Sequence, residues 1–399
     1  MSPSIITNPG YQLVVEEKSS LQSAAIGVWF QNGARYERDD QTGYAHLLEH
    51  LLFKGTRQHT AHELSSRFES MGGQINAETG RELTALHGVV PANDASEFLT
   101  LLLHMLTETT FSEEEFYLER DVVLQELAML DDDPEEALED FSTEQVWQNH
   151  SMGRQILGTR ESLTAVSYAG FIEYMRTVLG KNHFTIVAVG RINKDALISV
   201  CQQLNDKTDN KITSKTPAYH SCSTQFDLGS QQQHLLWLMP AVNYGHSKIA
   251  IYDIANHLLG GGYDSRLYQC LREKHGLVYS IDSRCDFYAD TGLWFIQTNT
   301  DNDNSDKTRQ ITIDTINELA TSGPSNSELN NAKSHLQASM ILEADDIACR
   351  MENIAHDVIY CGQVPSLQDQ IDAYQAVQIK DVISVMNSAW KCHSFFTSR

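Results

Sequence analysis

The order of secondary-structure patterns occurs twice along this chain, and this repeat constrains the fold more than any single motif. In the first half, the strand-like runs YQLVVEE and SAAIGVWFQ precede an apolar helix, which is followed by two strand-like runs and long helical patterns. In the second half, strand-like HLLWLMPAV precedes helical YDIANHLLGGG, and two strand-like runs and further helices follow. A repeated order of this kind indicates two similar domains, each with its own core.

The domain boundaries follow from length and composition. A chain of 399 residues exceeds the usual size of one hydrophobic core, so two domains of about 200 residues are expected. Residues 206–225, DKTDNKITSKTPAYHSCSTQ, lose the apolar periodicity and are predicted to form a polar linker. We therefore expect a first domain over residues 1–205 and a second over residues 226–399.

The helix expected within GYAHLLEHLLFKGT, residues 43–56, carries three polar side chains in an otherwise apolar segment. His46, Glu49 and His50 lie at i, i+3 and i+4, so they share one stripe of the helix. Two histidines one turn apart can direct ring nitrogens at one ion, and Glu49 can take a proton from a metal-bound water. We therefore predict a metal site. The alternative is a pair of histidines that find hydrogen-bond partners in a core.

A catalytic zinc ion needs a third protein ligand. The seven cysteines all lie from Cys201 onward, so the first half offers only histidines and carboxylates. In EFYLERDVVLQELAML, Glu119 and Glu126 are two helical turns apart on the face that should be buried. One of them can be a ligand and the other an acceptor that orients an imidazole. The pattern leaves open which is which.

The second copy lacks this set of polar residues. When EHLLF is aligned with NHLLG, His257 falls on His50, whereas Asp253 stands in place of the first histidine and Asn256 in place of the glutamate. The second domain is therefore expected to have no zinc ligands.

Charge and cysteine usage exclude several classes of partner. A net charge of -24 argues against nucleic acid and anionic membranes, because phosphates would be repelled. Much of this charge lies in residues 111–145, which form either a solvated acidic face or a wall that attracts basic peptides. We see neither a secretory signal nor a run of ~20 apolar residues. The scattered cysteines, without a CxxC pair, are typical of reduced thiols, so a bacterial-type cytoplasmic protein is expected.

The spacing of His46, Glu49, His50 and Glu126 resembles the pitrilysin family of zinc peptidases, in which the motif H-x-x-E-H is followed by a distant glutamate ligand. The segments YERDDQTGYAHLLEHLLFKGT, GGQINAETGRELT and ERDVVLQE are similar to family segments. The resemblance implies an α+β fold of two homologous tandem α/β domains, each a mostly antiparallel sheet packed with helices. It also implies one zinc ion per chain, with Glu126 as the third ligand and Glu119 as the supporting acid.

The same resemblance implies how a peptide is held. In similar proteins, residues matching Asn76 and Ala77 contact the substrate backbone on a strand whose edge can pair with an extended peptide. Arg272 and Tyr279, in LGGGYDSRLYQCLREKHGLVYS, match an arginine and a tyrosine that face the zinc and could stabilise an oxyanion. From the residues alone, the alternatives are a turn asparagine, a surface arginine and a half-buried strand tyrosine.

These features predict a zinc-dependent endopeptidase that hydrolyses peptides, or unfolded or leader segments, through a metal-activated water. The alternative is a non-catalytic peptide-binding or scaffold subunit of a hetero-oligomeric peptidase complex. Family chains of this length act as dimers. Because this chain carries both the zinc residues and the arginine–tyrosine pair, a homodimer with two composite active sites is expected.

Overall fold

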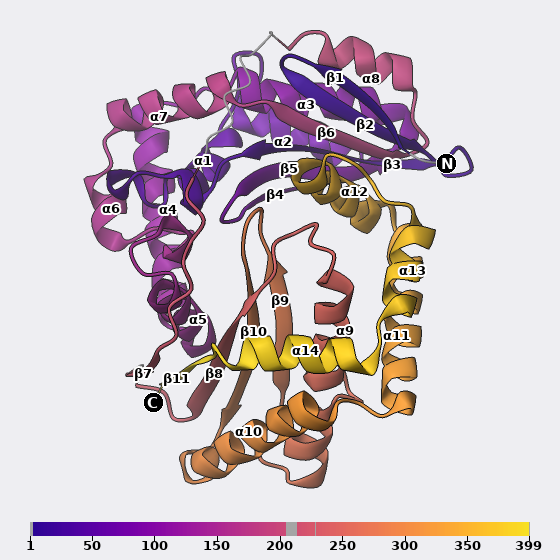
Figure 1. The fold of residues 1–399 in the computed structure, drawn as a ribbon. Helices are drawn as coiled ribbons and strands as arrows, with labels where there is room; N and C mark the ends of the chain where they lie inside the picture. The colour runs from indigo at the N-terminus through magenta and orange to yellow at the C-terminus, as the bar shows by residue number, and fades with distance from the viewer. Residues whose placement is uncertain (1–2, 205–213, 228, 399) are drawn as a thin grey trace. The chain divides into compact units, whose positions relative to one another are not determined.

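The computed structural model describes residues 3–204, 214–227 and 229–398, which form two compact units (Figure 1). The first unit draws on residues 1–129, 154–215 and 343–364, and the second on residues 130–153, 216–342 and 365–399. Unlike the predicted domains, these units are not contiguous in sequence, because each half of the chain gives one helical segment to the other unit. Residues 206–213 of the predicted linker lie outside the described residues.

The first unit is built on a six-stranded sheet of order β1-β2-β6-β3-β5-β4. Its neighbouring strands are antiparallel except for β2 and β6, which are parallel. The strand β4 lies at one edge, where it pairs with β5 on one side only among the described residues. The strands are β1 (Ser4–Asn8), β2 (Tyr11–Glu17), β3 (Ser23–Gln31), β4 (Gln74–Thr79), β5 (Leu83–Pro91) and β6 (Phe184–Gly190).

Helices cover both faces of this sheet, which explains why its central strands are apolar at nearly every position. Alternate side chains such as Leu13 and Ile26 join the larger core. The helices around it are α1 (Tyr44–Leu52), α2 (Ala61–Ser70), α3 (Ala95–Thr107), α4 (Glu113–Asp131), α6 (Arg160–Ala165), α7 (Tyr168–Lys181) and α8 (Lys194–Cys201). The intervening residues Val14 and Trp29 face the other way and pack on α12 (Ile347–His356), which comes from the second half of the chain.

The second unit repeats this plan around a five-stranded sheet of order β7-β11-β8-β10-β9. The strands β7 and β11 are parallel and the other neighbours are antiparallel. In both sheets the parallel pair is followed by three strands that are antiparallel to their neighbours, β3-β5-β4 in the first sheet and β8-β10-β9 in the second. This shared order accounts for the repeat in the sequence. The strands are β7 (Ser223–Phe226), β8 (Gln233–Ala241), β9 (Ile281–Phe287), β10 (Gly292–Thr300) and β11 (Ser394–Ser398), so β7 begins inside the predicted linker.

This second sheet also has two buried faces. One carries α9 (Ile249–Leu259), α10 (Ser305–Ser322), α11 (Asn326–Asp345), α13 (Leu367–Ala376) and α14 (Ile379–Trp390). The other packs on α5 (Pro134–Val146), which comes from the first half of the chain, through Leu138 and the nearby Trp147. Each unit is thus a mostly antiparallel sheet between helices, and the predicted α+β fold is confirmed. None of the described helices has the length and apolar character needed to cross a membrane.

Candidate metal centre

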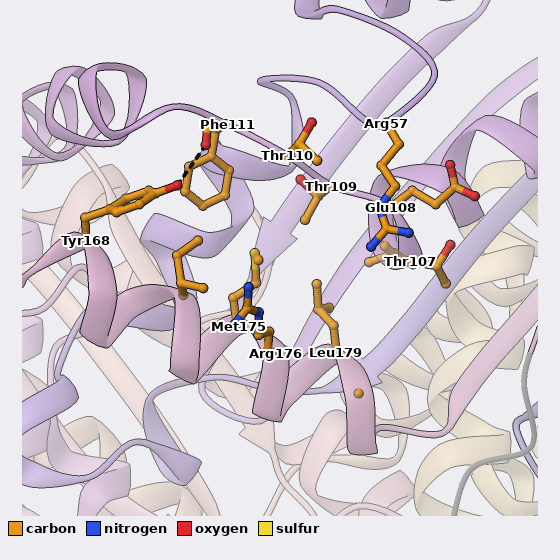
Figure 2. A pocket seen from close by; sticks show the side chains of 13 residues that line it. Arg57, Thr107, Glu108, Thr109, Thr110, Phe111, Tyr168, Met175, Arg176 and Leu179 are labelled. Carbon is orange, nitrogen blue, oxygen red and sulfur yellow. Dashed lines mark hydrogen bonds between the residues drawn. The ribbon is translucent and has the colours of Figure 1, made fainter.

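The first unit has several surface hollows, and the one in Figure 2 holds none of the predicted site residues. It has a volume of about 490 Å³ and lies between α7 and the segment that follows α3. A hydrogen bond of 3.2 Å from the Tyr168 hydroxyl to the Phe111 carbonyl closes one end. The site residues predicted in the first half of the chain lie elsewhere, on α1, α4 and β4.

The helix α1 begins at a position that only glycine can occupy. Gly43 has φ 89°, and a Cβ atom there would lie 2.5 Å from the Leu157 carbonyl oxygen. The buried carboxylate of Glu37 accepts hydrogen bonds from the backbone N–H groups of Gly43 (3.0 Å) and Ala45 (2.7 Å). These are donors that the first turn of a helix leaves unsatisfied. Burial raises the pKa of Glu37 to about 7, although the two N–H donors and Arg154 act in the opposite direction.

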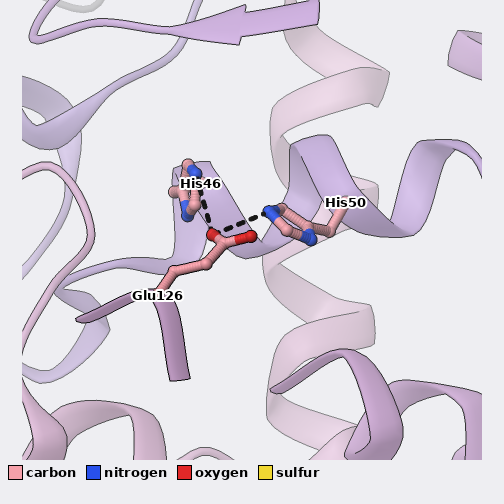
Figure 3. A group of neighbouring side chains, drawn as sticks. All are labelled: His46, His50 and Glu126. Atoms are coloured by element: carbon pink, nitrogen blue, oxygen red, sulfur yellow. Dashed lines mark ion pairs between the residues drawn. The ribbon is translucent and has the colours of Figure 1, made fainter. Parts of the chain in front are cut away.

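Two imidazoles on α1 and a carboxylate on α4 converge on one point (Figure 3). The Nε2 atom of His50 lies 3.3 Å from Glu126 Oε2, and that of His46 lies 3.9 Å from the same oxygen. One ligand atom from each residue lies within 4.8 Å of the others. Among the described residues, this is the only such group of three or more histidine, cysteine and acidic side chains.

Glu119, two turns before Glu126 on α4, lies behind His50. Its Oε2 atom is 3.3 Å from His50 Nδ1, and its other oxygen forms an ion pair with Lys54. Glu119 therefore faces Nδ1 of the His50 ring, and the Nε2 atom of the same ring faces Glu126. The structure thereby separates the two glutamates that the sequence pattern could not distinguish. Glu126 lies between the two Nε2 atoms, and Glu119 orients one of the rings.

This donor set fits a metal ion. The Nε2 atoms of His46 and His50 both face Glu126 Oε2, so three atoms that can bind a metal ion surround one point. Burial lowers the pKa of His46 to about 4, so this ring is neutral near pH 7. Neutral imidazoles and a carboxylate are the ligands of a catalytic zinc site.

Glu49 lies on the same stripe of α1 as the two histidines. Burial raises its pKa, and a hydrogen bond from the Thr79 side chain acts in the opposite direction. Its Oε2 atom is buried and has no hydrogen-bond partner among the described residues. One oxygen of this carboxylate therefore remains available to accept a proton.

The predicted substrate residues adjoin this centre. Asn76 and Ala77 of β4 line a hollow of about 290 Å³ together with Glu49, His50, Phe53, Lys54, Ile75 and Glu119. Asn76 and Ile75 also line a neighbouring groove of about 870 Å³ that follows β4. The free edge of β4 thus lies beside this groove and also beside Glu49 and His50 of α1.

Arg272 and Tyr279 lie beside each other in the second unit. Arg272 Nε donates a hydrogen bond of 3.1 Å to the Tyr279 carbonyl oxygen, and its guanidinium stacks on Tyr268. Arg272 lies in a π-helical turn, and Tyr279 precedes β9 with 84% of its surface exposed. Tyr279 is therefore not the half-buried strand residue that the residues alone suggested.

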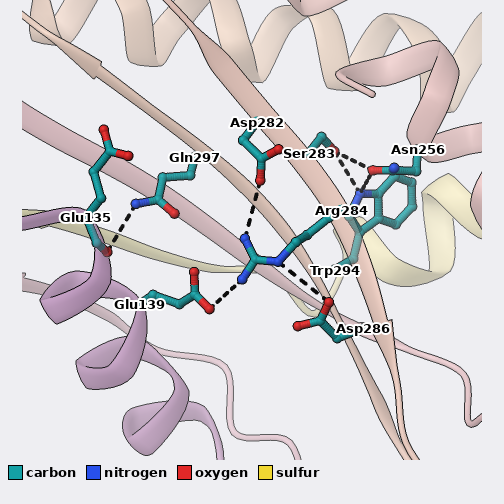
Figure 4. A network of polar contacts seen from close by, with 9 residues as sticks. All are labelled: Glu135, Glu139, Asn256, Asp282, Ser283, Arg284, Asp286, Trp294 and Gln297. Atoms are coloured by element: carbon teal, nitrogen blue, oxygen red, sulfur yellow. Dashed lines mark hydrogen bonds and ion pairs between the residues drawn. The ribbon is translucent and has the colours of Figure 1, made fainter. Parts of the chain in front are cut away.

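The second unit uses its counterpart positions differently. Asn256 Oδ1 accepts hydrogen bonds from Ser283 Oγ (2.6 Å) and Trp294 Nε1 (2.9 Å), next to a cluster of carboxylates around Arg284 (Figure 4). His257 is buried and stacks on His335, with ring centroids 4.4 Å apart. No metal-binding group was found among the described residues of this unit.

Comparison with known proteins agrees with this geometry. Residues 12–160 match the family described as insulinase (peptidase family M16), and residues 165–336 match the peptidase M16 inactive domain. An uncharacterized zinc protease of Bacillus subtilis is 30% identical over 375 residues, which cover 94% of this chain and 92% of that protein. Another, from Streptomyces coelicolor, is 28% identical over 390 residues and covers 94% of this chain and 84% of the relative.

Two solved structures share the fold. A protease from Helicobacter pylori has a TM-score of 0.91 and 18% identity, and covers 100% of this chain and 99% of its own. A peptidase M16 inactive domain from Pseudomonas fluorescens has a TM-score of 0.90 and 18% identity, with 100% and 98% covered. The matches to both halves and the relatives named zinc proteases establish the family. This chain belongs to peptidase family M16, the pitrilysin family of zinc metallopeptidases.

Proposed function

We propose that this chain is a zinc-dependent endopeptidase that hydrolyses peptides, or unfolded or leader segments. The observation that carries the proposal is the convergence of His50 Nε2, at 3.3 Å, and His46 Nε2, at 3.9 Å, on Glu126 Oε2. These three residues would hold the ion. When bound, zinc supplies a Lewis acid that polarises a peptide carbonyl and lowers the pKa of water.

In this proposal, Glu49 moves the proton. Its free Oε2 accepts a proton from the attacking water and later delivers it to the leaving amine, as general acid–base catalysis requires. The position of Glu49 on the stripe shared with His46 and His50 supports this role. No other side chain that lines the hollow beside His50 combines a buried, unpartnered carboxylate oxygen with this position among the described residues.

We assign the binding of the peptide backbone to β4. An extended peptide would pair with the free edge of β4 beside Asn76 and Ala77, in the manner of an added strand. Backbone pairing fixes the scissile bond while demanding little of the substrate side chains. The groove of about 870 Å³ along β4 is large enough to take several of those side chains.

We further propose a homodimer in which the zinc centre of one subunit is completed by Arg272 and Tyr279 of the other. The adjacency of this pair and the exposure of Tyr279 support the proposal, because an exposed phenol and guanidinium can donate to an oxyanion. An inactive Glu49→Gln chain mixed with an inactive Arg272→Ala chain should then regain activity. Verified mixed dimers without any recovery would contradict shared sites.

We place the protein in the cytoplasm. All seven cysteines lie among the described residues and are free, which suits a reducing compartment.

The substitution Glu49→Gln tests the catalytic proposal. The amide keeps the size of the side chain but cannot take a proton, so zinc should be retained while peptide hydrolysis falls by roughly 10²- to 10⁴-fold. His50→Ala should lose both zinc and hydrolysis. The exposed Glu114→Gln on α4 is the matched control and should change neither. Hydrolysis by Glu49→Gln at the wild-type rate would refute the proton-transfer role, and it would leave a non-catalytic peptide-binding subunit as the better interpretation.

A further inference from the structure

The hollow shown in Figure 2 combines an apolar floor with positive charge, and the proposed hydrolysis does not use it. It lies within the first unit, between α7, the end of α3 and the segments that follow α1 and α3. Its volume of about 490 Å³ is in the range of about 300 to 1,000 Å³ that is usual for small-molecule sites. None of the residues assigned to zinc, proton transfer or the peptide lines this hollow.

The floor of the hollow is a part of the first hydrophobic core that reaches the surface. Leu106 at the end of α3 is buried, as are Met175 and Leu179 on α7, and all three belong to the main core of this unit. The partly buried Phe111 and Ile172 also contribute to the apolar lining. An apolar chain that replaces water on this floor would therefore gain free energy.

Two arginines without partners line the same hollow. Arg57 comes from the segment after α1 and Arg176 from α7. Neither side chain makes a hydrogen bond, ion pair or ring contact with a described residue, and among the described arginines the same holds only for Arg160. The chain has 53 acidic residues against 29 lysines and arginines, so an arginine on its surface readily meets a carboxylate. Two unpaired arginines in one hollow therefore indicate that their partner comes from outside the chain.

The charged groups around the hollow fit a ligand with one negative charge. Glu108 is the only acidic residue in the lining, and its Oε2 atom accepts a hydrogen bond of 3.0 Å from Gln58 Nε2. Two guanidinium groups and one carboxylate give the lining a net positive charge of one, although the whole chain carries -24. A guanidinium group can bind a carboxylate through two parallel hydrogen bonds. The Thr110 hydroxyl, which has no partner among the described residues, can donate another.

We propose that this hollow binds an aliphatic carboxylate, a molecule with one negative charge and an apolar chain. Its carboxylate binds Arg57 and Arg176, and its chain covers the floor formed by the buried residues of α3 and α7. A small inorganic anion would leave this floor in contact with water, and a cationic chain would be repelled by the two guanidinium groups. Binding therefore needs both the negative charge and the apolar chain.

Isothermal titration calorimetry of the full chain with octanoate tests this site. Arg57→Gln and Arg176→Gln should each weaken octanoate binding by about 10-fold or more, because each removes hydrogen bonds between charged groups. The matched control is Arg160→Gln, which removes an exposed, unpartnered arginine on α6 outside the hollow and should bind octanoate like the wild type. His50→Ala should also bind octanoate like the wild type, so the outcome does not depend on the proposed zinc ion or on hydrolysis.

Three further probes separate the charge from the chain. Hexanoate should bind more weakly than octanoate, by about fourfold for each CH₂ group removed. Acetate lacks the chain and octylammonium has the opposite charge, so neither should bind measurably. The site is overturned if octanoate does not bind the wild type, or if acetate or octylammonium binds as tightly as octanoate. It is also overturned if Arg57→Gln and Arg176→Gln bind octanoate as tightly as Arg160→Gln does.

Discussion

Replacement of Glu119 by glutamine should weaken zinc binding without disturbing the fold. In the structure, Glu119 accepts from His50 Nδ1 at 3.3 Å with one oxygen and pairs with Lys54 through the other. A glutamine of the same size has one carbonyl oxygen, so it can accept from only one of these two donors, and its NH₂ group must face the other. In either orientation His50 Nδ1 loses its charged acceptor, because it faces a neutral amide oxygen or an NH₂ group.

The expected size of the effect follows from the role of this contact. His50 Nδ1 donates to a carboxylate, and hydrogen bonds to a charged acceptor are about twice as strong as neutral ones. Loss of the acceptor that fixes a metal-binding histidine typically weakens metal affinity by about 10- to 100-fold. This corresponds to roughly 1.4 to 2.7 kcal/mol. We therefore expect the zinc Kd of Glu119→Gln to rise by one to two orders of magnitude.

Competition with a chromogenic chelator measures this Kd directly. Glu114→Gln makes the same chemical change on an exposed face of α4 and should leave the Kd unchanged. Thermal unfolding of the metal-free proteins shows whether both variants remain folded. A Glu119→Gln protein that binds zinc as tightly as Glu114→Gln would refute the argument that Glu119 orients His50.

Two further predictions concern buried residues that support the unit carrying the site. Burial raises the pKa of Glu37 from 4.5 to about 7, so the protonated form of this side chain favours the folded state. Its contribution to the free energy of unfolding is fully present below pH 4.5 and is lost as the pH rises through 7. Between pH 4.5 and pH 7 the free energy of unfolding of the wild type should therefore fall by roughly 3 kcal/mol more than that of Glu37→Gln. If urea unfolding gives parallel pH profiles for the two proteins, the raised pKa of Glu37 is contradicted. Ile354 of α12 is 0% exposed in the core of the first unit, so Ile354→Ala should lower the free energy of unfolding of this unit by about 2 to 5 kcal/mol. The exposed Cys349→Ala on the same helix should change it by less than about 0.5 kcal/mol, and equal effects would show that α12 is not a structural part of the unit.

The sequence was most informative where chemistry restricts spacing. The i, i+4 pair His46 and His50 predicted a shared ion because helix geometry alone brings the two rings together, and the structure has them 4.8 Å apart. The same local geometry placed Glu119 and Glu126 on one face of a helix. It could not assign their roles, because these depend on the angle at which α4 crosses α1, and that angle is a tertiary property.

The periodicity of the sequence could not predict which distant segments pack against each other. The pattern of residues 134–146 predicts a helix but does not say that Leu138 packs on the second sheet. The sequence likewise does not say that Ile354 packs on the first sheet. The strand-like runs YQLVVEE and SAAIGVWFQ correctly predicted β2 and β3. They gave no indication of which helix covers the second face of each sheet.

The two copies differ in how the helix residue at the Glu49 position uses its side-chain oxygen. In the second unit, Ser283 of the edge strand β9 donates a hydrogen bond to Asn256 Oδ1. Asn256 Oδ1 accepts from Trp294 as well, so its only oxygen is engaged by two donors, whereas Glu49 keeps a buried oxygen that accepts from none of the described residues. The second copy has therefore turned this position into a structural contact. A glutamate at this position would meet the two buried donors Ser283 and Trp294, so reintroducing the zinc residues alone would not recreate the unpartnered oxygen of the first site.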